Sequence, residues 1–113
     1  MNRALHVVFG ASGYIGSNLV PELLRAGHRV RATARNIEVL EGRGWQGVEP
    51  ARADALDPAS LPAALAGADV AYYLVHSMAA GSDFAAIDRR AAENFARAAE
   101  KAGVRRIVYL GGL

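Results

Sequence analysis

The chain is predicted to fold as a doubly wound α/β domain built on one parallel sheet. Strand-type and helix-type segments alternate along its 113 residues, and a glycine-rich turn directly follows the first strand. Because parallel strands need crossover connections, and these are right-handed, five such strands imply the order 3-2-1-4-5. We expect helices on both faces of this sheet.

Each element is expected from its local pattern of apolar residues, glycines and prolines. The expected strands are residues 5–9, 28–34, 48–53, 69–75 and 104–110. The expected helices run from Ile15 to Gly27 and over about 37–43, 58–67 and 83–102.

The first and last helices are the most strongly patterned. The first has apolar residues at helical spacing and ends at a glycine; the stripe is Ile15, Leu19, Leu23 and Leu24. The last also ends at a glycine, Gly103, and its apolar face is predicted to be Phe84, Ile87, Ala91, Phe95, Ala98 and Ala102.

Prolines and aspartates mark the elements between them. Pro50 places the third strand at the sheet edge, because proline cannot donate to a ladder. Asp57 is expected to cap a helix that has Pro58 at its first position. The continuous apolar run 69–75 is typical of a central strand that is covered on both faces.

The predicted topology leaves one face incomplete after strand 5. The chain stops at Leu113, before a helix that would cover strands 4 and 5 on the side of the first helix. We therefore expect a partly bare face, to which a partner, a second copy or a further C-terminal segment belongs. The residues expected to be bare are Tyr73, Val75, Val108 or Leu110.

Composition narrows the function classes. The chain is 52% hydrophobic with a net charge of +2, and its arginines are scattered without a cluster, so neither disorder nor nucleic-acid binding is indicated. It has no cysteine, and His6, His28 and His76 lie far apart in sequence, so a metal site is not expected. The N-terminal apolar run is too short for a signal peptide or membrane span, which favours a cytoplasmic protein.

The glycine-rich turn Gly10-Ala11-Ser12-Gly13-Tyr14-Ile15-Gly16 predicts a dinucleotide site. Gly10 allows a tight turn out of the strand, Gly13 lets a pyrophosphate approach the backbone, and Gly16 lets the helix pack closely. The helix N-terminus adds free N–H donors and partial positive charge. The alternative is a tight turn that holds no ligand.

The end of the second strand favours NADP over NAD. An NAD site usually has an acidic residue there for the ribose 2′-hydroxyl, but none stands between Glu22 and Glu38. Arg31 and Arg35 frame the strand end instead, with Asn36 beside them, and Arg35 could bind a 2′-phosphate. Alternatively, Arg35 is a solvated surface charge.

Several motifs together resemble atypical short-chain dehydrogenases/reductases near the NmrA-like group, which have Rossmann-type domains. The resemblance spans residues 1–113 as the N-terminal portion of such a domain. Its motifs are Gly-x-x-Gly-x-x-Gly at 10–16, Asp-Ala-Leu-Asp at 54–57, Tyr-Tyr-Leu-Val-His-Ser-Met at 72–78, Asp88 with Asn94, and Arg-Ile-Val-Tyr-Leu-Gly-Gly-Leu at 106–113. It implies that relatives continue well beyond this length.

The resemblance also implies further cofactor contacts. It places Asp54, with Ala55 beside it, where the family binds the adenine amino group, and it places Leu74, Val75 and His76 along the cofactor. Asp54 could instead form a local turn. His76 could carry a proton, although a loop histidine bonded to backbone is the plainer interpretation.

The sequence departs from the family at the catalytic residues. Active members use a Tyr-x-x-x-Lys pair and a Ser or Thr after strand 5, but the only lysine is Lys101, four residues after Arg97, and strand 5 is followed by Gly111. The catalytic residues are therefore unknown. The chain is either the cofactor-binding part of an NADP-dependent oxidoreductase or a non-catalytic NADP(H)-sensing module. A structural protein with an empty turn is the third reading.

Overall fold

The computed structural model describes residues 3–75 and 82–109, and it confirms the predicted fold class and strand order. All strand pairs are parallel, in the order β3-β2-β1-β4-β5. The strands are β1 (Leu5–Phe9), β2 (Arg29–Ala34), β3 (Val48–Arg52), β4 (Val70–Tyr73) and β5 (Arg106–Tyr109). The helices are α1 (Tyr14–Arg25), α2 (Ile37–Glu41), the 3-10 turn η1 (Pro58–Ser60), α3 (Leu61–Leu65) and α4 (Ser82–Ala102).

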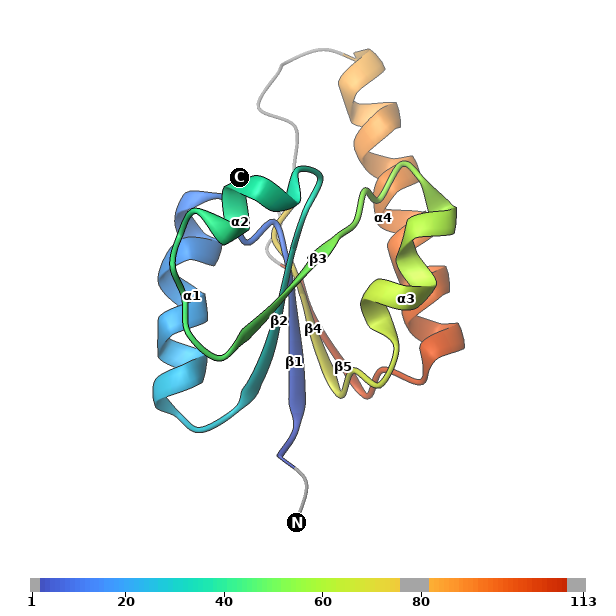
Figure 1. Ribbon diagram of the computed structural model, residues 1–113. Coiled ribbons are helices and arrows are strands. Elements are labelled where there is room, and N and C mark those ends of the chain that lie inside the picture. Colours follow the sequence, from blue (N-terminus) through green and yellow to red (C-terminus); the bar gives the residue numbers. More distant parts are fainter. Residues whose placement is uncertain (1–2, 76–81, 110–113) are drawn as a thin grey trace.

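The helices form one layer on each face of the sheet. α1 and α2 lie on one face, and α3 and α4 lie on the other (Figure 1). On the first face Val8 of β1 packs with Val20 and Leu23 of α1. On the second, Phe9 and Tyr73 lie against Phe95 of α4, with ring centroids 4.8 and 4.7 Å apart. Two apolar cores therefore hold the sheet, one on each face.

The apolar stripes are shifted from the predicted ones. Gly16, Val20 and Leu23 form the buried face of α1, whereas Ile15 is 44% exposed. On α4 the buried positions are Ala91, Phe95 and Ala99, and Ile87 is 40% exposed. Phe84 falls outside the side chains that the structure describes.

The segment expected to be one helix over 58–67 is divided. It begins as the 3-10 turn η1 and continues as α3, which has Pro62 near its start. Asp57 occupies the N-cap position, but its side chain makes no capping hydrogen bond, so the expected cap is wrong. Its carboxylate lies 3.7 Å from the guanidinium of Arg52 instead.

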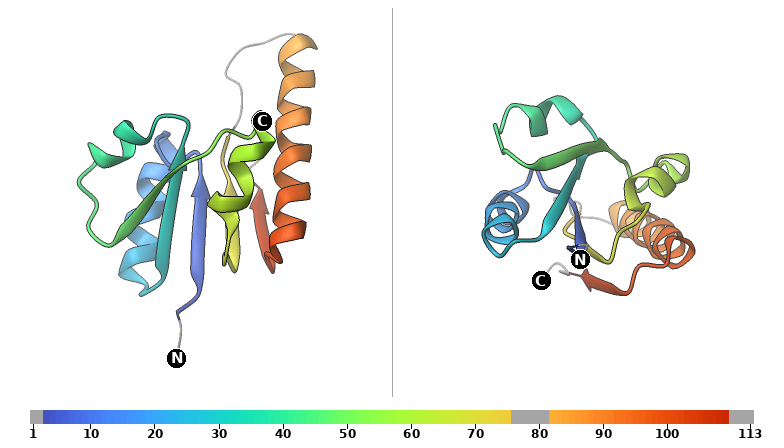
Figure 2. Two further views of the ribbon diagram at one scale, coloured as in Figure 1. Left: turned by 45° about the vertical axis from the view of Figure 1, so that its right-hand side comes forward. Right: turned by 60° about the horizontal axis from the view of Figure 1, so that its bottom comes forward.

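The face of β4 and β5 on the α1 side has no helix over it among the described residues (Figure 2). Val108 is 38% exposed, as predicted for a bare face. Val75 is equally exposed, but it lies beyond the end of β4 and lines a cleft at the carboxyl ends of the strands, so its exposure does not test this prediction. The prediction for Tyr73 is wrong, because its side chain points to the α4 face and is 3% exposed. Successive side chains of a strand alternate, so Tyr72 is the residue on the α1 face. Leu110 lies outside the described residues.

Candidate dinucleotide site

A cleft of about 520 Å³ lies at the carboxyl ends of β1, β2, β3 and β4, and it brings most of the predicted site residues together. From the predicted set it is lined by Gly10, Ser12, Gly13, Tyr14, Ile15, Gly16, Arg35, Asp54, Ala55, Leu74 and Val75. Phe9, Thr33, Ala34 and Ala53 complete the lining. Ala11 and Asn36 do not line the cleft, and His76 lies outside the described residues.

Two of the three turn glycines are required by the packing of the protein itself. Gly10 has a φ of +88°, and a Cβ there would lie 3.2 Å from the carbonyl carbon of Leu74. A Cβ on Gly16 would lie 2.5 Å from the carbonyl oxygen of Gly10, well inside van der Waals contact. These glycines therefore allow the turn to lie against β4 and allow α1 to sit directly on the turn.

Gly13 differs from both. Its backbone is extended, with φ −77° and ψ 177°, a conformation that any residue adopts. A Cβ there would have no neighbour closer than 3.5 Å, the carbonyl oxygen of Gly10. The protein's own packing thus gives no reason for a glycine at this position, which lines the cleft. A ligand that approaches the backbone at Gly13 would supply that reason.

The start of α1 presents unpaired donors at the same place. The first bond of the helix runs from the Ser17 N–H to the carbonyl of Gly13 at 2.9 Å. Within the described part of the chain, the N–H groups of Tyr14, Ile15 and Gly16 have no acceptor, and no side chain caps the helix. With the positive end of the helix dipole, they favour an anion. Ala11 is structural, because its N–H donates to the Thr33 carbonyl.

The expected arginine pair at the end of β2 is divided by the structure. Arg35 is exposed, lines the cleft, and makes no ion pair with any described residue. Arg31 points to the α3 face, where its Nη1 donates to the carbonyls of Ala64 and Ala66 at 2.8 and 2.9 Å. The prediction that Arg31 frames the site is wrong, since its guanidinium is used to terminate α3.

Asn36 and Asp54 both serve local turns. The Oδ1 of Asn36 accepts a hydrogen bond from the Glu38 N–H at 3.0 Å and caps α2. The Oδ1 of Asp54 accepts from the Leu56 N–H at 2.9 Å, which is the turn-forming role that the sequence left open. Asp54 nevertheless lines the cleft, and its second carboxylate oxygen has no partner among the described residues.

The wall formed by Asp54 and Ala55 is tied to α4. The side-chain amide of Asn94 donates to the carbonyl oxygen of Ala55 at 2.8 Å. Ser60 supports the same loop, because its hydroxyl accepts from the Asp54 N–H at 3.0 Å. Asn94 was singled out in the sequence only as part of a motif, and the structure gives it a positioning role.

A charged residue that contacts the glycine-rich turn was also not predicted from the sequence. Arg43, in the loop after α2, donates from Nη2 to the carbonyl oxygen of Ser12 at 2.8 Å, 31 residues away along the chain. Its guanidinium carbon lies 6.0 Å from the centre of the Trp45 ring. No motif marks Arg43, because the contact depends on how the loop after α2 returns toward the glycine-rich turn.

Tyr73, a buried tyrosine at the end of β4, has a raised pKa. Burial, followed by the nearby Tyr109, Asp88 and Asp54, raises the pKa of Tyr73 at the end of β4 to about 12. Tyr73 therefore keeps its proton at neutral pH. Across residues 3–75 and 82–109, no group of three or more His, Asp or Glu side chains could hold a metal ion. In the same ranges no helix is both long and apolar enough to cross a bilayer.

The order strand, glycine-rich turn and helix, with a cleft at the carboxyl ends of a 3-2-1-4-5 sheet, defines a Rossmann-type dinucleotide-binding domain. The comparison with protein families agrees. The model of the NAD(P)H-binding family matches residues 10–113, so the chain belongs to the NAD(P)H-binding family. The predicted relationship to short-chain dehydrogenases/reductases is thereby confirmed.

Two curated plant enzymes are similar in sequence. Cinnamoyl-CoA reductase 1 from Oryza sativa subsp. japonica is 37% identical over 114 residues, which cover 95% of this chain and 34% of that enzyme. The chloroplastic divinyl chlorophyllide a 8-vinyl-reductase from Zea mays is 46% identical over 68 residues, covering 53% of this chain and 17% of that enzyme. The chain thus spans a third or less of the length of these relatives.

Solved structures share the fold. The triphenylmethane reductase of Citrobacter sp. in complex with NADP(H) has a TM-score of 0.77 at 29% identity, over 94% of this chain and 36% of that one. The NADPH-dependent quinone oxidoreductase of Escherichia coli in complex with NADPH has a TM-score of 0.76 at 26% identity, over 92% and 35%.

Proposed function

We propose that this chain is the cofactor-binding part of an NADP(H)-dependent oxidoreductase. The observation that carries the proposal is Gly13, which the protein's own packing does not require and which faces the cleft beside unpaired N–H donors. The family membership and the similar reductases with bound NADP(H) or NADPH support it. When bound, the nicotinamide cofactor would supply hydride-transfer chemistry.

In this proposal each wall of the cleft has one task. The N–H groups of Tyr14, Ile15 and Gly16 bind the pyrophosphate. Arg35 binds the 2′-phosphate, in the place where an NAD site has a carboxylate. The free carboxylate oxygen of Asp54 accepts from the adenine amino group. The preference for NADP follows from the Arg35 charge.

The proposal is tested by a matched pair of glycine substitutions. Gly13 has an extended backbone and Gly42 a helical one, and other residues adopt both conformations without strain. A Cβ at either position would lie 3.5 Å from its nearest neighbour. Only Gly13 lines the cleft. Gly13→Val should weaken NADP binding more than tenfold, about 1.4 kcal/mol, while Gly42→Val changes it less than twofold. Calorimetric titration with NADP and NAD measures both.

Equal affinities in the wild type and in Gly13→Val would remove the cofactor assignment at this turn. Circular dichroism of both variants is the folding control. Because the two substitutions add the same side chain, a general loss of stability would affect Gly42→Val as well.

A non-catalytic NADP(H)-sensing module, as in the NmrA-like group, is the second candidate. It is favoured by the sequence after β5, which has Gly111 in place of a Ser or Thr. Assays of NADPH oxidation with aldehydes, ketones and quinones separate the two candidates. Steady turnover favours the enzyme, and cofactor binding without turnover favours the sensor.

The proposal extends to location and partners. A cytoplasmic location fits the composition, which also gives no nucleic-acid footprint and no membrane span. The exposed Val108 fits a face that packs against the remainder of a longer protein or against a second copy. Sedimentation measurements over a range of concentrations would detect the second copy.

A further inference from the structure

The loop between α2 and β3 reaches the glycine-rich turn through one side chain. Arg43 donates to the carbonyl oxygen of Ser12 at 2.8 Å, and its own N–H donates to the carbonyl of Leu40 at 3.1 Å, which fixes the start of the loop. The loop contains Gly44 and Gly47, whose φ angles of +69° and +82° turn it back toward the sheet. The guanidinium is thereby held at the rim of the cleft.

The charge of Arg43 is not neutralised by a carboxylate. Arg43 is exposed and forms no ion pair with any described residue, although Glu38 and Glu41 lie on the preceding helix. The guanidinium has five N–H donors, and the Ser12 carbonyl takes one of them. The remaining donors are available to a second acceptor.

Ser12 connects Arg43 to the cleft that Arg35 lines. Ser12 and Arg35 both line the cleft, and Arg43 is bonded to Ser12 from the rim. In a Rossmann-type domain the adenosine ribose lies between the glycine-rich turn and the end of β2, which here are Ser12 and Arg35. A phosphate on the ribose 2′ position would therefore lie within reach of Arg43.

We propose that Arg43 is a specificity-determining residue that binds the 2′-phosphate from the rim of the cleft, together with Arg35. This inference rests on the proposed function. One N–H keeps the contact with Ser12 while others donate to the phosphate, so that the ligand closes the loop after α2 onto the glycine-rich turn. NAD has no phosphate at this position and gains nothing from Arg43.

Phosphate binding by Arg43 can be distinguished experimentally from a purely structural role, in which Arg43 only holds the loop after α2 against the glycine-rich turn. A residue that only holds the glycine-rich turn would affect the affinities for NADP and NAD equally, because both cofactors place a pyrophosphate at this turn. A phosphate-binding residue acts on NADP alone. Lysine keeps the charge of Arg43 but not its fork of donors, so it cannot bond Ser12 and the phosphate in the same way.

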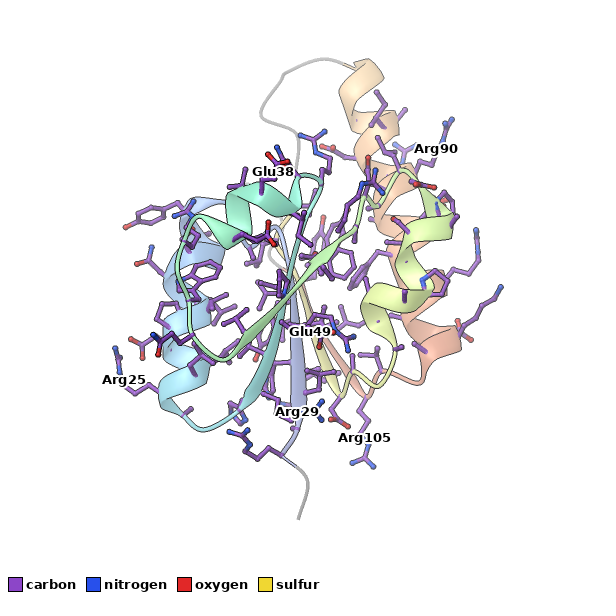
Figure 3. The ribbon with its side chains drawn as sticks, in the orientation of Figure 1. Arg25, Arg29, Glu38, Glu49, Arg90 and Arg105 are labelled. Atoms are coloured by element: carbon purple, nitrogen blue, oxygen red, sulfur yellow. The ribbon has the colours of Figure 1, made fainter. Side chains whose placement is uncertain are left out.

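The experiment is calorimetric titration of NADP, NAD, 2′,5′-ADP and 5′-ADP against the wild type, Arg43→Ala, Arg43→Lys and Arg29→Ala. Arg29 is exposed and begins β2, at the end of the strands opposite the cleft (Figure 3), so its removal changes the net charge equally without touching the cleft. Arg43→Ala should weaken NADP and 2′,5′-ADP about tenfold and leave NAD and 5′-ADP within twofold. Arg43→Lys should fall between, and Arg29→Ala should match the wild type.

An equal loss for all ligands in Arg43→Ala, or no loss for any, overturns the proposal. So does an identical loss of NADP affinity in Arg29→Ala, which would mean that net charge alone matters. If the wild type binds none of the four ligands, the proposed function fails instead, and the two failures remain distinct.

Discussion

One row of side chains crosses the sheet from a covered half to an open half. Ala32, Val8, Tyr72 and Val108 are aligned in register on β2, β1, β4 and β5, on the face that α1 covers in part. Ala32 and Val8 are fully buried, whereas Val108 is 38% exposed. α1 packs mainly on β1 and β2. Val8 and Val108 have the same side chain, so the difference in their contribution to stability depends on whether a helix covers them.

The comparison shows that an apolar strand sequence does not by itself indicate a buried strand. Hydrophobic stabilisation follows the apolar area removed from water, about 25 cal/mol per Å², and not the residue type alone. β5 has an apolar sequence, but all four of its residues are exposed among the described part of the chain. Its apolar side chains therefore contribute less to stability than buried side chains of the same type.

The largest predicted effect comes from a substitution that displaces α1 from β1 and β2. In Gly16→Ala the new methyl group would lie 2.5 Å from the Gly10 carbonyl oxygen and 2.6 Å from the Ala11 Cα, and backbone atoms at both contacts cannot move aside. α1 must shift away from β1, and we expect a loss of about 3 kcal/mol in the free energy of unfolding. Urea denaturation measures this loss.

The matched control for that substitution is Gly13→Ala. Its methyl group has no neighbour closer than 3.5 Å, so stability should change by less than about 0.5 kcal/mol. If both variants were equally stable, the close seat of α1 on the turn would not support the covered half.

The second prediction compares the two valines of the row directly. Val8→Ala leaves a cavity in a fully buried core and should cost about 2 kcal/mol. Val108→Ala should cost less than about 1 kcal/mol, because the side chain is already partly in water. Equal losses in urea denaturation would indicate that the β5 face is covered in solution, for example by a second copy, and dilution would then restore the difference.

The smallest predicted effect is the pH dependence of stability that arises from His6, which lies beside Tyr72 where the covered and open parts of the sheet meet. His6 is buried beside Tyr72, with its Nδ1 2.9 Å from the tyrosine oxygen, and its ring centroid is 4.0 Å from that of His28. Burial, and then the nearby His28, hold the pKa of His6 below the ordinary 6.5, while Asp69 opposes the shift.

The sign of the pH dependence follows from the lowered pKa. The unfolded state takes up the proton first as the pH falls through 6.5, so the folded state loses stability below that pH. His6→Gln should flatten the acid side of the stability curve measured by urea denaturation. An unchanged curve would assign the acid loss to other groups.

The sequence was sufficient for the fold because its signals are local. The glycine-rich turn, Pro50 at an edge and the helix-length connections each depend on a few neighbouring residues, and together they admit one strand order. The positions of Gly10, Gly13 and Gly16 in the cleft follow from the same turn.

Two features of the site and its surroundings could not be predicted in this way. Tyr72 and Tyr73 are adjacent and identical, so the face that each occupies depends on the register of β4 against β1. The roles of Arg31 and Arg43 depend on contacts with Ala64 and Ser12, which are about 30 residues distant in the chain. Arginines that make such contacts have no local pattern to distinguish them from surface charges.

The contact of Arg31 with α3 also bears on the order of folding. α3 has five residues, too few to persist alone, and its final turn ends at carbonyls that receive N–H donors from β2. The Arg31 Nε also lies 3.1 Å from Glu49 on β3, as a charge contact whose N–H points off the line of a hydrogen bond. The end of the helix therefore depends on a side chain of β2, so this part of the chain should assemble from the sheet outward.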